Sequence, residues 1–105
     1  MMSEQQEAFS RALDHTRDGN YAAALQEFVW LHDNPNPDDL SSEMFRRANG
    51  FLAWATLGTK YPPAAQKMRE MLEAKRALLQ RSPDDKFLGA DARAMQAALA
   101  TYEKQ

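Results

Sequence analysis

This chain has no cysteine, only four glycines and no long apolar run. Without cysteine it has no disulfide bond, no thiolate nucleophile and no thiolate metal ligand. No apolar run exceeds the five residues of segment 51–55, far too few to span a bilayer. The first seven residues are polar and acidic, unlike a secretory signal. We therefore expect a cytoplasmic protein without a membrane partner.

Motifs of catalysis and metal binding are also missing. His15 and His32 are seventeen residues apart, with no paired ligand spacing, which favours surface or interhelical histidines over a metal site. Segment 33–43 has the acids of a calcium loop, but prolines occupy two ligand positions and the glycine is absent. No glycine cluster cradles a phosphate, and no serine lies in a nucleophile elbow. We expect no catalytic residue, no cofactor and no metal, and hence not an enzyme.

The net charge of −2 conceals a strong charge asymmetry. Residues 1–43 carry nine acids against two bases, a net of −7, whereas residues 44–105 carry eleven bases against six acids, a net of +5. Either the halves attract each other across a compact fold, or the molecule has an acidic and a basic face. The basic stretch 67–81 fits a solvated helix face better than a nucleic-acid site, because no nucleic-acid motif accompanies it.

Apolar residues recur with a period of 3.6, and period-two alternation is never sustained, which predicts an all-α fold. Ser3 and Gln6 form a capping box that starts the first helix, and Gly19 suits the left-handed turn that ends it. Ser41 or Ser42 is expected to cap the third helix, whose apolar residues cover over half its circumference. The third helix should therefore be the most buried of the five predicted helices. These helices are expected at about 4–18, 21–32, 42–57, 62–80 and 84–104.

A half-motif occurs twice, at 19–31 and again at 59–71. Such duplication is typical of helical repeat proteins. It predicts a single domain, 1–105, with antiparallel helix pairs at 4–34 and 42–81, and a capping helix at 84–104, in a right-handed stack. The matching positions are Tyr21 with Tyr61, Ala24 with Ala64, Gln26 with Gln66, Phe28 with Met68, and Leu31 with Met71.

The pattern Gly19-x-Tyr21-x-x-Ala24-x-x-x-Phe28 resembles the tetratricopeptide repeat. The first-helix signature is missing at Ala8 and Arg11, and the repeat is longer than usual, so the chain is tetratricopeptide-like. The resemblance implies a non-enzymatic module that binds a protein or peptide. The turn at 61–64 also resembles small bacterial helical proteins, some of which neutralise toxins. The alternative function is therefore an immunity or antitoxin protein that binds a cognate bacterial toxin.

Carried over from that family, the binding face is formed by the first helix of each unit. A partner segment would be buried against aromatic side chains while arginines pair with its carboxylates. Alternatively, Phe9 and Leu13 simply pack under the capping helix. The partner is a protein of unknown identity, or a second copy in a homodimer, and no nucleic acid. The expected binding residues are Phe9, Leu13, Arg17, Arg46, Asn49 and Trp54.

The repeat alignment predicts that Ala64 lies where the helices of the second pair approach most closely. Ala64→Leu should therefore overpack that contact and lower the free energy of unfolding by roughly 1–3 kcal/mol. Urea denaturation followed by circular dichroism measures the change. A variant as stable as the wild type would contradict the alignment.

Overall fold

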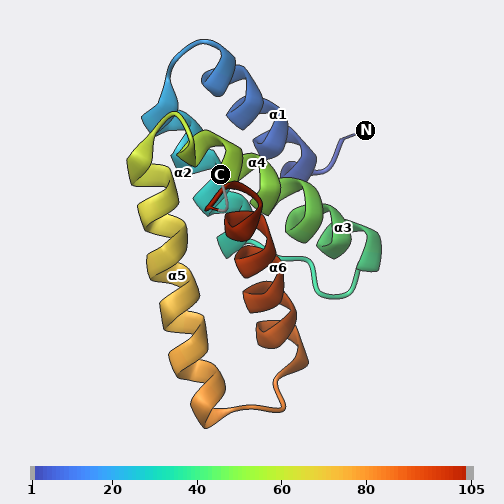
Figure 1. Cartoon of the computed structure of the whole chain (residues 1–105). Coiled ribbons are helices and arrows are strands. Elements are labelled where there is room, and N and C mark those ends of the chain that lie inside the picture. Colours follow the sequence, from blue (N-terminus) through green and yellow to red (C-terminus); the bar gives the residue numbers. More distant parts are fainter. Residues whose placement is uncertain (1, 104–105) are drawn as a thin grey trace.

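The computed structural model describes residues 2–103, and within them the chain forms five helices and no strand (Figure 1). The all-α prediction is therefore confirmed. Residue 104, the predicted end of the last helix, lies outside the described residues. The third helix is continuous but contains three segments, which we call together the central helix. The elements are α1 (Glu4–Arg17), α2 (Tyr21–Asp33), α3 (Leu40–Phe45), η1 (Arg46–Gly50), α4 (Phe51–Gly58), α5 (Pro62–Arg81) and α6 (Lys86–Glu103).

Local signals explain most of the helix boundaries. The capping box of Ser3 and Gln6 is present in both directions. Gly19 has a φ of 81°, the left-handed conformation that its lack of a Cβ permits. The cap predicted at Ser41 or Ser42 is wrong, because the side chain of Asp39 accepts the hydrogen bond from the Ser42 backbone instead. Asp is as good an N-cap as Ser, so the helix begins earlier.

The central helix changes its winding in the middle. Its segment η1 is a π-helix, in which each backbone N–H bonds five residues back, and such segments are often found at functional sites. Gly50 ends this segment and lies against α2, where an added Cβ would be 2.9 Å from Leu31 Cδ2. The glycine therefore lets α2 approach the central helix closely.

The other helices pack around the central helix. It contacts α2, α5 and α6, while α1 packs mainly on α2. The molecule is accordingly thin, with dimensions of 41 × 37 × 19 Å. Trp54 is fully buried, and its Nε1 donates to the Ala64 carbonyl oxygen at 2.8 Å. The central helix carries the most buried positions of the five helices of residues 2–103, as predicted.

Equivalent positions of the half-motif have similar surroundings. Ala24 and Ala64 are both fully buried, and Phe28 and Met68 both belong to the core. The rings of Tyr21 and Tyr61 pack against each other at a centroid distance of 5.9 Å. The duplicated pattern thus corresponds to the first turns of α2 and α5, whose equivalent residues have similar surroundings. The right-handed repeat stack itself stays a prediction.

The close approach of α4 and α5 at Gly58 generates a stability prediction. An added Cβ on Gly58 would lie 2.8 Å from Ala65 Cβ and 3.1 Å from its backbone nitrogen, so α4 and α5 must separate. Gly58→Ala gains about 1 kcal/mol of helix propensity, but overpacking costs roughly 1–3 kcal/mol. We expect a net loss of stability, measured as a lower melting temperature.

Gly89→Ala is the matched control, because Gly89 lies inside α6 and its added Cβ would meet only the flexible end of Arg93, at 3.2 Å. This variant should keep or raise the melting temperature. If Gly58→Ala were stabilised as much as the control, the close approach of α4 and α5 would be refuted.

Candidate functional site

Two residues expected on the binding face are inaccessible. The side chains of Arg46 and Trp54 are both 0 % exposed, so neither can contact a partner. The sequence expectation that they anchor a partner is therefore wrong. Both lie on the side of the central helix that faces the core, because α2, α5 and α6 surround it. An arginine and a tryptophan are typical interface anchors, but here they hold the fold together.

The other expected residues do not form one anchor cluster. Phe9 is half-buried, and its ring packs edge-on against Phe45 at 5.0 Å and Phe28 at 6.4 Å. Leu13 is 45 % exposed, so the alternative that it is buried under the capping helix is wrong. Arg17 is exposed and already paired with acids of its own helix end, Asp14 and Asp18. Asn49 is exposed on η1.

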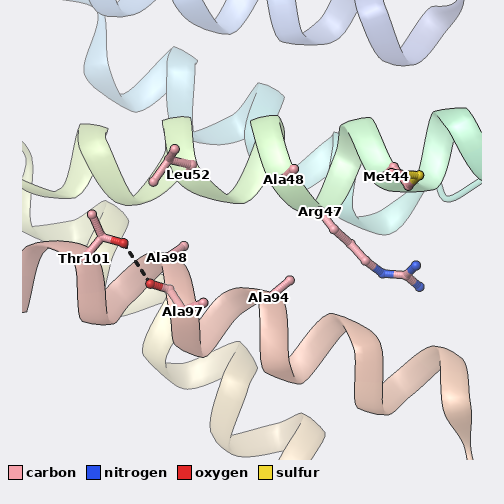
Figure 2. Close-up of a pocket in the computed structure, with 8 residues that line it drawn as sticks. All are labelled: Met44, Arg47, Ala48, Leu52, Ala94, Ala97, Ala98 and Thr101. Atoms are coloured by element: carbon pink, nitrogen blue, oxygen red, sulfur yellow. Dashed lines mark hydrogen bonds between the residues drawn. The ribbon is translucent and has the colours of Figure 1, made fainter.

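An apolar groove lies between the central helix and α6 (Figure 2). It has a volume of about 390 Å³ and is open to solvent. One end carries the guanidinium of Arg47, and the rest is apolar. Thr101 does not change this character, because its hydroxyl donates to the Ala97 carbonyl oxygen at 2.9 Å. The lining residues are Met44, Arg47, Ala48, Leu52, Ala94, Ala97, Ala98 and Thr101.

The two walls of the groove differ in shape. The central helix contributes a ridge of apolar residues spaced four apart, in which Met44, Ala48 and Leu52 line the groove and Leu40 lies one step beyond them. Three of the four are among the exposed large apolar residues, with exposures of 72 %, 61 % and 42 % in chain order. A spacing of four drifts around an α-helix, and the wider turn of η1 counteracts that drift. The wall on α6 is instead a floor of alanines.

A buried ionic network joins the two walls. Arg46 Nη2 donates to both carboxylate oxygens of Asp91 on α6, at 2.7 and 2.8 Å. The same guanidinium donates to Glu43 Oε1 at 3.2 Å and to the His32 carbonyl oxygen at 3.2 Å. Glu43 in turn accepts from the Asn36 backbone at 2.8 Å. One arginine thus links α2, the connection after it, the central helix and α6.

Two further cations complete the network. Arg47 Nε donates to Asp91 Oδ1 at 2.8 Å, and Lys75 Nζ lies 3.5 Å from Asp91 Oδ2. Three cations therefore face two carboxylates. Arg47 is the most exposed of the three, with 20 % of its side chain accessible, and its guanidinium lies 4.8 Å from the centre of the Phe87 ring. The surplus positive charge is thus located at one end of the groove.

The network holds Asp91 in its ionised form. Burial by itself raises the pKa of Asp91, but hydrogen bonds from Arg46 and Arg47 and the nearby positive charges outweigh burial. The pKa of Asp91 is consequently below its usual value of 3.8. The ionised carboxylate is therefore the form that the two arginines favour.

His32 lies at the edge of this network. Its ring contacts Phe51 and Trp54, and its Nδ1 is 2.8 Å from Asp33 Oδ1. The Nε2 atom is buried and has no hydrogen-bond partner. Burial lowers the pKa of His32 below 6.5, and the charges of Lys75 and Arg46 add to this effect, whereas Asp33 opposes it. The neutral imidazole is therefore the form that the fold favours.

Sequence reasoning missed Asp91, Glu43, Arg47 and Lys75. A signal was present for Asp91, which comes three residues after Leu88 and four before Met95, on the apolar stripe of its helix. A carboxylate on a buried stripe requires a cationic partner. The partner was not identifiable, because it lies 45 residues away in the chain.

Other kinds of site find no support in the described residues. Within residues 2–103, no group of three or more acidic or histidine side chains is arranged to hold a metal. No helix in that range is long and apolar enough to cross a membrane. Comparisons with family models, curated proteins and solved structures found no match to this chain. The tetratricopeptide resemblance therefore rests on the chain's own residues.

The network generates a prediction about stability. Asp91→Ala leaves Arg46 buried without its principal partner, and breaking a buried ion pair costs about 3–5 kcal/mol. Chemical denaturation should show a loss of that size or an unfolded chain. Asp84→Ala is the control, since this exposed acid lies just before the same helix and should change stability little. Equal effects of the two changes would contradict the assigned role.

A second prediction concerns pH. The unfolded chain takes up a proton on His32 more readily than the folded chain, so stability falls as the pH drops below 6.5. Asp91 adds a further loss at lower pH, near and below 3.8, for the same reason. Denaturation at a series of pH values measures both. His32→Gln should reduce the loss just below pH 6.5, whereas His15→Gln should retain it.

Proposed function

We propose that this protein is a non-enzymatic protein-interaction module that binds an apolar surface of a protein partner in the groove between the central helix and α6. The observation that carries the proposal is the exposure of Met44 and Leu52 along an apolar groove. Large apolar side chains scattered singly on a surface need no explanation. A contiguous apolar groove is characteristic of interaction sites.

The groove has the physical properties that docking requires. Burying an exposed Leu or Met side chain contributes about 1.5–3 kcal/mol, so a partner that covers the ridge gains substantial free energy. The alanine floor on α6 allows a partner backbone to approach closely. Met44 has an unbranched, adaptable side chain that can adjust to the surface that covers it.

The ionic network supports the proposal by making the groove rigid. Arg46 and Arg47 tie the central helix to Asp91 on α6, so both walls hold their relative positions before a partner arrives. A preformed site loses less conformational entropy on binding than a flexible one. The tetratricopeptide-like pattern supports the same function class, because members of that family bind proteins and peptides.

The test uses one alanine of the floor and one elsewhere. Ala97 is exposed and lines the groove, whereas Ala77 is exposed on α5 and does not line it. Ala97→Arg fills the groove with a long charged side chain, and Ala77→Arg makes the same chemical change elsewhere. Against a partner identified by affinity capture, Ala97→Arg should weaken binding at least tenfold, about 1.4 kcal/mol.

Calorimetric titration measures both affinities, and circular dichroism checks that both variants are folded. Wild-type affinity in Ala97→Arg, with the groove filled, would refute the groove as the binding site. An equal loss in Ala77→Arg would indicate a general effect of added charge.

A further inference from the structure

The groove offers almost no hydrogen-bonding atoms to an occupant. Its wall on α6 consists of alanines and Thr101, whose hydroxyl already donates within its own helix. The central helix contributes the apolar Met44, Ala48 and Leu52, and in addition Arg47. A polar group that is buried without a hydrogen bond costs free energy. A segment that lies along this surface therefore has to satisfy its own backbone N–H and C=O groups.

A helix meets this requirement, whereas an extended segment does not. The backbone groups of an α-helix bond to one another, but an extended peptide needs the edge of a sheet. The part of the chain that the structure describes forms no strand and so offers no such edge. We infer that the occupant of the groove is an amphipathic helix of the partner protein, with an apolar face and one acidic side chain that binds Arg47. The inference rests on the proposed function, since it gives the chemistry of the segment that this groove binds.

The shape of the groove determines the apolar face of such a helix. On the central helix the small Ala48 separates the larger Met44 and Leu52, which are eight residues apart, or about two turns of helix. Ala94 on α6 lies across the groove from Ala48 (Figure 2). These two small residues leave room for one large apolar side chain of the partner. Its neighbours three or four residues away then lie beside Met44 and Leu52.

The charge at one end of the groove determines where the acidic side chain lies. In the buried network Arg46, Arg47 and Lys75 face Glu43 and Asp91, so three cations against two carboxylates leave one positive charge. Arg47 is the most accessible cation, with 20 % of its side chain exposed against 12 % for Lys75 and 0 % for Arg46. A partner carboxylate at this end offsets the surplus charge. Further along the groove the lining is apolar and would leave other charges unpaired.

The guanidinium of Arg47 is already held in place for that carboxylate. Its Nε donates to Asp91 at 2.8 Å, and the group lies 4.8 Å from the centre of the Phe87 ring. Its Nη2 lies 3.7 Å from Glu43 Oε1, which is beyond hydrogen-bond distance. Figure 2 shows both Nη atoms at the end of the groove. Because a guanidinium has donors on all three nitrogens, Arg47 can bind a second carboxylate while it keeps Asp91.

Selection from a peptide library tests the chemistry of the occupant. The probe is a phage-displayed library of helical peptides of about 18 residues, or five turns, randomised on one face. Peptides that bind Ala97→Arg, in which the groove is filled, are removed before selection on the wild-type chain. The selected peptides should share large apolar residues three or four positions apart and an Asp or Glu near one end of that stripe. A matched library with two central prolines, which break the helix, should yield no groove binders.

Paired substitutions in peptide and protein then test the contact with Arg47. Replacing the selected acid by Gln should weaken binding to the wild-type chain about tenfold, because a charge-assisted hydrogen bond is lost. The same replacement should not change binding to Arg47→Gln. This variant should fold, since two cations still face two carboxylates, and circular dichroism checks it. Arg93→Gln is the matched control, because Arg93 is exposed on α6 and does not line the groove.

The dependence on salt tests the same contact without any change in the protein. Added salt should weaken binding of the acidic peptide more than binding of its Gln form, because accessible charges are screened. An acidic peptide and a Gln form that bind equally well at low salt would refute the contact with Arg47.

The outcomes separate this inference from the proposed function. If the selected peptides are displaced by Ala97→Arg but carry no acid, the groove is a docking site and the contact with Arg47 is wrong. If the proline library yields the groove binders, the helical occupant is wrong. If sedimentation shows that the wild-type chain self-associates and Ala97→Arg does not, a second copy occupies the groove and the inference is overturned. If no peptide distinguishes the wild type from Ala97→Arg, both proposals fail.

Discussion

The interaction between Arg46 and Asp91 is the constraint on which the rest of this structure depends. It joins the central helix to the last helix by two short hydrogen bonds within a fully buried environment. A buried charge is costly unless it is paired, so neither residue tolerates the loss of the other. Because Arg46 also bonds to Glu43 and to the end of α2, the position of α6 is coupled to the first half of the chain.

The network lies beside the apolar groove and ties its two walls together. Two helices with alanines and a few larger apolar residues between them would gain free energy by packing closer and burying those residues. The ion pairs hold α6 against one end of the central helix, where Arg47 packs on Phe87 and binds Asp91. Met44 and Leu52 are exposed beside this contact. In the function proposed above, this groove is where the protein partner docks.

The local features of the fold were largely predictable from the sequence, whereas the residues of the candidate site were not. Helix boundaries follow from caps, glycines and prolines near each end, as at Gly19 and Pro62, because these act within a few residues. Predicting the candidate binding face requires knowledge of which side of each helix faces the core. Arg46 and Trp54 were assigned to the surface by analogy, but their neighbours in space bury both.

The sequence by itself determined that the chain is all-helical, that its central helix is apolar, and that its two halves differ in net charge. Periodicity, capping and composition are local properties, and they act on each segment before the segments meet. Only the tertiary structure decided that Asp91 meets Arg46 across 45 residues, that η1 aligns the exposed ridge, and that a groove remains beside it. The physical reason is that pairing and packing depend on distances between helices, and no local pattern encodes those distances.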